Sequence, residues 1–273
     1  MLKSFVFLFM LSLLSLSIDA ILNYQRHNCS NTMTFTPNST FQANLNLALS
    51  FLSSNATHNN IGFYNATAGH DPPDVAYANF LCRGNLVSQV CQECVMNASK
   101  MIVHKCPNNK AAMIVYDECT LRYSNRSFFS IVEEEPVIAG CNVENVMQTD
   151  PDGFMQFVGD TMRNLAIGAT SDHSPGKKFA AKKASGVHSV KALYSVAQCT
   201  PDLSVDDCKD CLVNATDLLL SQCRGKIGGR VVLLSCNVRY ELYPFYDNAA
   251  ASSRGKDEWI NDSLLGSFVF LQH

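Results

Sequence analysis

Cysteines at short, regular spacing are the residues of this 273-residue chain best suited to chemistry. The stretch CRGNLVSQVCQEC, from Cys82 to Cys94, ends in C-x-x-C, a spacing shared by redox centres, zinc sites and structural disulfides. A thioredoxin-like redox pair has no use for a third cysteine nine residues upstream, and a zinc site requires four ligands that stay reduced. We therefore interpret these cysteines as disulfide partners, with metal and redox roles as the alternatives.

The N-terminus predicts the redox compartment. Residues 1–20, MLKSFVFLFMLSLLSLSIDA, combine a positive Lys3, an apolar run from Phe5 to Leu16 and a small residue at Ala20. This pattern is typical of a secretory signal peptide, and an uncleaved anchor is the alternative. Because secreted proteins fold in an oxidising space, the twelve cysteines, an even number, are expected to form disulfides.

Eight N-x-[ST] sequons favour a secreted glycoprotein. The sequon of Asn28 contains Cys29, so disulfide formation competes with glycosylation there. The remaining candidates are Asn38, Asn55, Asn65, Asn97, Asn125, Asn214 and Asn261.

The cysteine spacing repeats along the chain. From Cys82 the steps to the next four cysteines are 9, 3, 12 and 13 residues, and from Cys199 they are again 9, 3, 12 and 13. The offset is 117 residues, and Cys29 and Cys141 precede the two copies at slightly different distances. The same offset relates Arg122-Tyr123 to Arg239-Tyr240. A period this long indicates two tandem globular domains rather than a solenoid.

The repeat defines the domain organisation. We predict a signal peptide over residues 1–20, a first domain over 27–130, a linker over 131–138, a second domain over 139–246 and a disordered tail over 247–273. Helical periodicity is expected over 41–53, 89–103, 153–167 and 205–222, with a capping box from Ser204 to Asp207. Strand-like runs cover 74–81, 111–123, 190–198 and 229–246. This order favours an α+β fold with antiparallel sheets.

Composition and motifs argue against other classes. A net charge of −3 lends no electrostatic support to a nucleic-acid partner. The sequence contains no nucleophile elbow, P-loop or HExxH motif, so we expect no enzyme and no catalytic residue. The seven histidines are scattered, so neither a metal site nor a cofactor is expected. No apolar run near 20 residues follows the second domain, so we expect no transmembrane segment. A GPI signal ending in Leu264–Leu271 is the alternative reading of the tail.

The duplicated C-x8-C-x2-C frame, followed by CTLRYSNRSFF and CNVRYELYPFY, resembles the plant cysteine-rich repeat secretory proteins. Their ginkbilobin-like domain is also called the stress-antifungal or DUF26 domain, and in tandem it forms the ectodomain of cysteine-rich receptor-like kinases. The resemblance implies two helices on a five-stranded antiparallel sheet and three disulfides in each domain. The implied pairs are Cys29–Cys106, Cys82–Cys91, Cys94–Cys119, Cys141–Cys223, Cys199–Cys208 and Cys211–Cys236.

The resemblance also implies a carbohydrate site. The antifungal lectin of the family binds mannose through an Asn, an Arg and a Glu, and the matching positions of the second domain hold Asn142, Arg230 and Glu241. Amide, guanidinium and carboxylate groups together satisfy sugar hydroxyls, which both donate and accept. The alternative is that they are ordinary strand and turn residues. Eleven residues of straight strand would separate Arg230 from Glu241 by about 35 Å, so the chain must reverse between them.

In the first domain the matching positions hold Ser30, Met113 and Ser124, and none of the three residue types is retained. The lysine-rich stretch 176–191 is expected to be a solvated hairpin, with attraction to acidic polysaccharide or an anionic membrane as the alternative. Phe128-Phe129 and the run from Tyr243 to Tyr246 are expected to pack in the core or between the domains, or to form a partner-binding patch.

Two functions follow from these readings. The first is a mannose-binding defence or antifungal protein of the plant apoplast, with the three residues of the second domain gathered in one exposed concavity. The second is a non-catalytic extracellular module that pairs with a related ectodomain or receptor. An exposed apolar patch is expected for the second.

Overall fold

The structure is a computed structural model that describes residues 22–30, 32–58, 60–146, 150–171, 176–187, 190–246 and 268–269. The predicted signal peptide and the sequon at Asn261 lie outside the described residues, as does most of the predicted tail.

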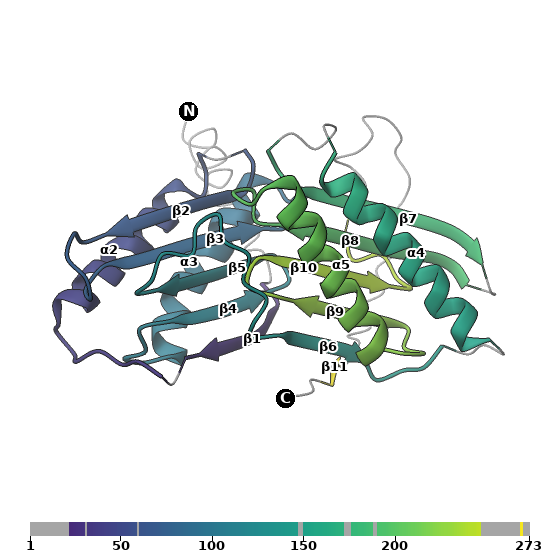
Figure 1. Ribbon diagram of the computed structural model, residues 1–273, viewed down its shortest axis with the longest axis horizontal. Coiled ribbons are helices and arrows are strands. Elements are labelled where there is room, and N and C mark those ends of the chain that lie inside the picture. Colours follow the sequence, from purple (N-terminus) through teal and green to yellow (C-terminus); the bar gives the residue numbers. More distant parts are fainter. Residues whose placement is uncertain are drawn as a thin grey trace, which may run out of the picture.

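The first domain places two helices against one antiparallel sheet with the strand order β1-β4-β5-β3-β2 (Figure 1). Its elements are β1 (Tyr24–Cys29), α2 (Thr40–Asn55), β2 (Phe63–Ala68), β3 (Ala76–Cys82), α3 (Ser88–Lys105), β4 (Ala112–Tyr116) and β5 (Cys119–Ser124).

The second domain repeats this arrangement with the strand order β6-β9-β10-β8-β7, and a two-residue strand, β11 (Phe268–Val269), adds to the sheet beside β6. Its elements are β6 (Ile138–Asn142), α4 (Pro151–Ala169), β7 (Phe179–Val187), β8 (Val190–Cys199), α5 (Val205–Gln222), β9 (Gly228–Val232) and β10 (Cys236–Glu241). The α+β class, with two helices on five antiparallel strands in each domain, is therefore confirmed.

Helices α2, α4 and α5 begin where a side chain can satisfy one of their first N–H groups, whereas α3 begins after Val87, which provides no side-chain cap. Ser204 accepts a hydrogen bond from the N–H of Asp207, as the predicted capping box requires, and Ser39 accepts from the N–H of Gln42 in the same way. Asp150 caps α4 and is followed by Pro151, a residue well suited to the first helical position. The helix ends expected from periodicity therefore lie within a few residues of the observed ones.

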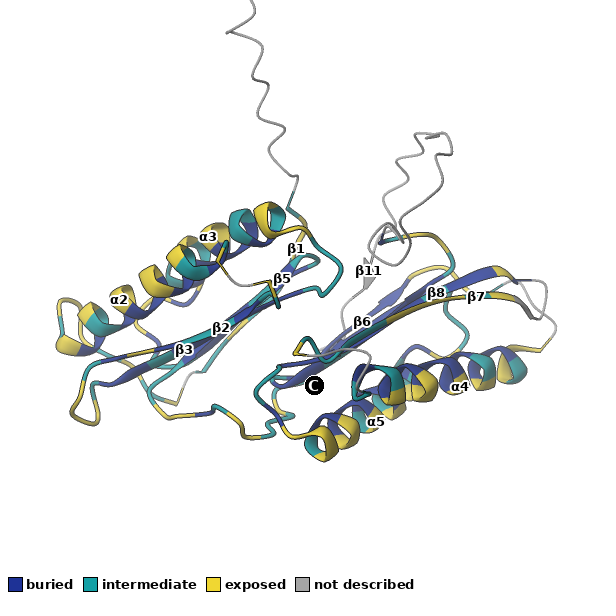
Figure 2. Ribbon diagram, turned by 90° about the horizontal axis from the view of Figure 1, so that it is seen from above, coloured by how far each residue is buried: buried dark blue, intermediate teal, exposed yellow. Residues whose placement is uncertain are grey.

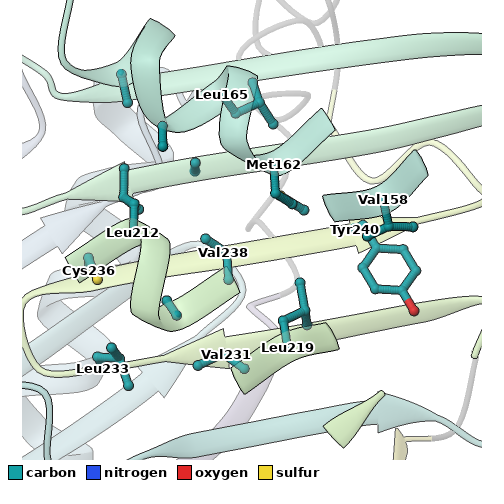
Figure 3. Packing of buried hydrophobic residues seen from close by; sticks show 14 of the residues in the cluster. Val158, Met162, Leu165, Leu212, Leu219, Val231, Leu233, Cys236, Val238 and Tyr240 are labelled. Atoms are coloured by element: carbon teal, nitrogen blue, oxygen red, sulfur yellow. The ribbon is translucent and has the colours of Figure 1, made fainter. Parts of the chain in front are cut away.

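Each domain has its own hydrophobic core between helices and sheet. In the second domain, Figure 3 shows side chains of α4 and α5 meeting those of the strands beneath them. Met162 and Leu219 from the helices and Val238 and Tyr240 from β10 are fully buried there. The first domain uses the same layout, with Phe41 and Leu45 of α2 buried against the strands.

All six disulfides have the pairing that the resemblance implies. Cys29–Cys106, Cys82–Cys91 and Cys94–Cys119 link the first domain, and Cys141–Cys223, Cys199–Cys208 and Cys211–Cys236 link the second. The C-x-x-C pair therefore divides between two bonds. One cysteine ties the first turns of the helix to the preceding strand, and the other ties the helix to the second strand after it, β5 in the first domain and β10 in the second.

The two sheets face each other, and the helices lie on the outer sides of the molecule (Figure 2). A small apolar cluster of Met113, Val115, Ile138 and Val232 is buried between the domains, with Leu234 packed against it. The sheet face opposite the helices is thus partly covered in both domains.

The linker is bound to both domains. The N–H of Glu133 donates to the hydroxyl of Ser235 in the second domain, and its carboxylate forms an ion pair with Arg122 of the first domain. Just before the linker, the N–H of Ser130 donates to the carboxylate of Asp202 in the second domain. The first strand of that domain, β6, already begins at Ile138, inside the predicted linker. Two residues of the predicted disordered tail, β11 (Phe268–Val269), pair with Asn142 and Cys141 at the edge of the second sheet.

Candidate binding sites between the domains

The three predicted sugar-binding residues of the second domain lie on adjacent strands. Asn142 ends β6, Arg230 lies on β9 and Glu241 ends β10. The β9–β10 hairpin supplies the required chain reversal, because Gly228 pairs with Glu241 and Gly229 with Tyr240 across it. Residues two apart on a strand share a face, so Arg230, Gly228 and Glu241 are on one side of the sheet. Arg230 and Glu241 are therefore close in space although eleven residues separate them in the sequence.

The expectation of an exposed concavity at these residues is wrong. Asn142 is 2% exposed, Arg230 8% and Glu241 0%. The carboxylate of Glu241 covers Gly228 so closely that a Cβ atom there would overlap Oε2. Glycine at 228 is therefore required by the burial of Glu241.

Asp117 of the first domain contacts the charged face of the second. It lies in the turn between β4 and β5, and its carboxylate forms an ion pair with Arg230. The other carboxylate oxygen lies 3.4 Å from Nη1 of Arg239, whose Nε donates to Glu241 Oε1 at 2.9 Å. The guanidinium of Arg230 is thus already bound by a carboxylate of the same chain.

Burial and the two arginines set the electrostatics of this network. Burial alone raises the pKa of Asp117, but Arg230 and Arg239 outweigh it and hold that pKa below its usual range. Burial raises the pKa of Glu241 to about 6, against the opposing effect of Arg239. Among the described residues, Oε2 of Glu241 has no hydrogen-bond partner. We infer that Asp117 is the carboxylate that stays ionised between the two arginines.

The cavity left at this network is too small for a sugar. Its volume is about 40 Å³, and Asp117, Arg230 and Arg239 are among the residues that line it. One water occupies about 30 Å³ in the liquid, so a hexose does not fit while the two domains are in contact.

The corresponding region of the first domain is open. A cavity of about 210 Å³ is lined by Ser30, Met113 and Ser124, the positions that match the three residues of the second domain. Arg122 and Glu133 also line it and form an ion pair. The linker carboxylate of Glu133 thus pairs with Arg122 as Glu241 pairs with Arg239, the matching arginine of the second domain.

Sequence reasoning missed the residue that controls the second-domain site. Asp117 carries no motif, and the position that matches it in the second domain is Leu234. The one available signal was the repeated Arg-Tyr pair, since both arginines lie in buried charge networks and stack on aromatic rings. Arg122 lies 3.8 Å from the ring centroid of Phe128, and Arg239 lies 4.1 Å from that of Phe245.

The aromatic runs pack as interdomain and internal contacts. Phe129 meets Tyr77 edge to face, and Tyr246 meets Tyr194 in the same way. Phe245 also lies within 6.0 Å of Arg83 from the first domain. This agrees with the expectation of packing in the core or between the domains.

The lysine-rich stretch forms the β7–β8 hairpin, as expected. Lys177 donates to the carbonyl oxygen of Gly84 in the first domain, and Lys178 donates to those of Pro201 and Leu203. Lys182, Lys183 and Lys191 are exposed. Attraction to acidic polysaccharide or to an anionic membrane stays a prediction for those three.

The described sequons differ in environment. Asn38 is exposed, and Asn55 and Asn65 are half-buried. Asn97 accepts a hydrogen bond from the hydroxyl of Tyr116, and Asn214 donates to Glu134 of the linker. Nδ2 of Asn125 faces Met33, and its buried Oδ1 has no hydrogen-bond partner within the part of the chain that the structure describes. Occupancy of each sequon stays a prediction.

Comparison with known proteins supports the repeat. The family described as "Salt stress response/antifungal" matches residues 28–126 and 140–243. A putative cysteine-rich receptor-like protein kinase 20 of Arabidopsis thaliana is 38% identical over 245 residues, 89% of this chain and 36% of that protein. An antimicrobial ginkbilobin-2-like protein of Castanea crenata is 39% identical over 237 residues, 86% of this chain and 95% of that protein. The chain therefore spans about a third of the receptor kinases that it matches.

Solved structures show the same tandem fold. The tandem DUF26 ectodomain of the Arabidopsis thaliana receptor-like protein PDLP8 aligns with a TM-score of 0.68 at 24% identity, over 80% of this chain and 98% of that one. The ectodomain of PDLP5 aligns with a TM-score of 0.64 at 27% identity, over the same shares.

The duplicated fold and its six disulfides define an extracellular cysteine-rich tandem module. The chain belongs to the salt stress response/antifungal family, with two such domains in tandem. Within the described residues, no helix has the length and apolarity needed to cross a membrane.

Proposed function

We propose that the chain is a non-catalytic extracellular interaction module that pairs with a related ectodomain or receptor. The observation that carries this proposal is the ion pair between Asp117 and Arg230. It joins the two domains through the face that a family lectin would use for sugar. A partner must then be recognised by surfaces that the domain contact leaves open.

The outer face of α2 supplies such a surface. Leu47 and Phe51 are separated by one helical turn and are 46% and 41% exposed. A few well-packed side chains near the centre of an interface contribute most of its binding free energy. Several relatives are receptor-like kinases, which makes a tandem ectodomain of the same family the partner class to test first.

The test is capture of such ectodomains by the secreted, disulfide-intact chain, with affinity measured by surface plasmon resonance. We expect Leu47→Ser combined with Phe51→Ser to weaken capture by at least about tenfold. The matched control is Ile167→Ser on α4, where the side chain is 59% exposed. Equal loss in both variants, or no capture by the wild type, would contradict the proposal.

Mannose binding is the second candidate, favoured by the convergence of Asn142, Arg230 and Glu241 on adjacent strands. It requires the domain contact to open, because Asp117 now binds Arg230. A glycan array compares the wild type with Asp117→Ala, and growth inhibition of fungal cultures tests a role in plant defence in the apoplast. Mannose binding by Asp117→Ala would support this candidate if adding Arg230→Ala to that variant abolishes the binding. If neither the wild type nor Asp117→Ala binds mannose on the array, this candidate is wrong.

A further inference from the structure

The open cavity of the first domain is bounded by both domains and the linker. Its floor comes from strands β4 and β5, one wall from Glu133, Glu135 and Pro136 of the linker, and another from Leu234 of the second domain. Its volume of about 210 Å³ is below the roughly 300 Å³ at which drug-sized pockets begin. A ligand of this cavity is therefore small.

The repeat explains why the cavity exists. By the offset of 117 residues, Ser124 matches Glu241 and Ala111 matches Gly228. In the second domain the long Glu241 side chain fills this space, whereas in the first domain the short Ser124 leaves it empty. The Asn, Arg and Glu of the implied mannose site are all absent here, so the chemistry of the walls must decide the ligand.

The walls carry one uncompensated negative charge. Arg122, which is 8% exposed, forms an ion pair with Glu133, and the two charges cancel. Glu135 lines the same cavity and is exposed, and among the described residues no hydrogen bond or ion pair engages its carboxylate. An anionic ligand would be repelled, and a cationic one attracted.

The remaining walls are apolar. Met113 is buried in the cluster between the domains, and Leu234 packs against the same cluster. Pro136 continues this surface on the linker side. A hydrated inorganic cation makes no use of such a wall, whereas the body of an organic amine does.

We propose that this cavity binds a small organic cation, a primary ammonium on a short apolar or aromatic body. The ammonium lies at Glu135, and the body lies against Met113 and Leu234. The ligand has about ten non-hydrogen atoms, by the size of the cavity. This site is independent of the proposed partner surface on α2, on the opposite side of the sheet.

The experiment uses the full secreted chain and tyramine as the probe, with binding measured by calorimetry and by NMR saturation transfer. We expect sub-millimolar binding by the wild type and about tenfold weaker binding by Glu135→Gln, because the charged hydrogen bond is lost. The matched control is Glu134→Gln, since Glu134 belongs to the same linker but bonds to Asn214 and does not line the cavity. Binding in this control should stay unchanged.

A second variant tests the location without removing charge. Ser124→Gln places a neutral side chain of the length of Glu241 in the cavity, and we expect it to abolish tyramine binding at unchanged Tm. Four results would overturn the proposal. They are no binding below about 1 mM, equal loss in Glu135→Gln and Glu134→Gln, full binding by Ser124→Gln, and tighter binding of 4-hydroxyphenylacetate, which carries a carboxylate in place of the ammonium.

Discussion

Arg122 and Arg239 occupy matching positions in the two domains and have the same kind of surroundings. Each guanidinium stacks on a phenylalanine ring and pairs with a glutamate. The glutamate comes from the linker in the first domain and from β10 itself in the second. Because the glutamate comes from the linker in the first domain, a cavity remains there, whereas the Glu241 side chain fills the matching space in the second domain.

Glu241 should make stability depend on pH. Its pKa is raised from 4.5 to about 6 in the folded protein, so the folded state holds the proton more tightly than the unfolded chain. The resulting stabilisation is fully present below pH 4.5 and is lost as the pH rises through about 6. We expect Glu241→Gln, which mimics the protonated form, to gain about 2 kcal/mol relative to the wild type between pH 4 and pH 7.5. Urea unfolding at both pH values measures it, and a constant difference would contradict it.

Asp117 should contribute far more to the free energy of unfolding than a surface aspartate that pairs with an exposed arginine. Its ion pair with Arg230 has side chains that are 15% and 10% exposed, and removal leaves two buried arginines without that carboxylate. We expect Asp117→Ala to lower the free energy of unfolding by about 3 kcal/mol.

The control is Asp160→Ala, whose partner Arg163 is 53% exposed. A change below about 0.5 kcal/mol is expected there, because exposed pairs contribute little. Equal effects in the two variants would show that the Asp117 network contributes no more than a surface pair.

At the scale of elements, the hairpins position both candidate sites. The β4–β5 turn carries Asp117, and the β9–β10 hairpin brings Arg230 and Glu241 to one face. Helices α3 and α5 are fixed to these hairpins by Cys94–Cys119 and Cys211–Cys236. The strand framework that presents the charged residues is therefore crosslinked.

The disulfides should differ in their contribution to stability according to the loop that they close. Cys29–Cys106 joins residues 77 apart, whereas Cys82–Cys91 joins residues 9 apart. In the chain-entropy description the longer loop contributes about 2 kcal/mol more. We expect the corresponding double alanine variants to differ by that amount in urea unfolding.

The second domain supplies an internal replicate of this comparison. Cys141–Cys223 spans 82 residues and Cys199–Cys208 spans 9. The same order of stability should appear there, and an inverted order in both domains would show that native-state packing outweighs loop entropy.

At the scale of the whole molecule, contacts between the two domains extend from the ion pair of Asp117 and Arg230 to β7 at the edge of the second sheet. The amide of Gln198 donates to the carbonyl oxygen of Cys82, and Phe179 lies against Gly84. A Cβ atom at Gly84 would overlap the Phe179 ring. Glycine is therefore required where the first domain approaches β7.

Gly84→Ala should weaken the domain contact by about 1–3 kcal/mol, because the new Cβ would overlap both Cβ and the ring of Phe179, so that β7 itself must shift. We expect the thermal unfolding transition of the tandem to broaden or split. The control is Gly168→Ala in α4, where the nearest atom to a new Cβ is Ala180 Cβ at 3.4 Å and alanine favours the helix. A single sharp transition at unchanged Tm in Gly84→Ala would show that this contact does not couple the domains.

The local pattern of the chain determined much of this structure. Periodic apolar residues and Ser204 predicted the helices, because helix formation depends on neighbours within one or two turns. The offset of 117 residues predicted two copies of one domain, because a duplicated sequence repeats its core. Spacing alone allowed fifteen pairings of six cysteines in each copy, and the family resemblance implied the pairing that the structure has.

Only the tertiary structure decided whether the candidate sites are open. Asn142, Arg230 and Glu241 are of the residue types that bind a sugar, yet Asp117 from the other domain binds Arg230 first. That contact depends on how two separately folded sheets face each other, which no local pattern encodes. The cavity beside Glu135 depends on the same placement, because its walls come from two domains and the linker.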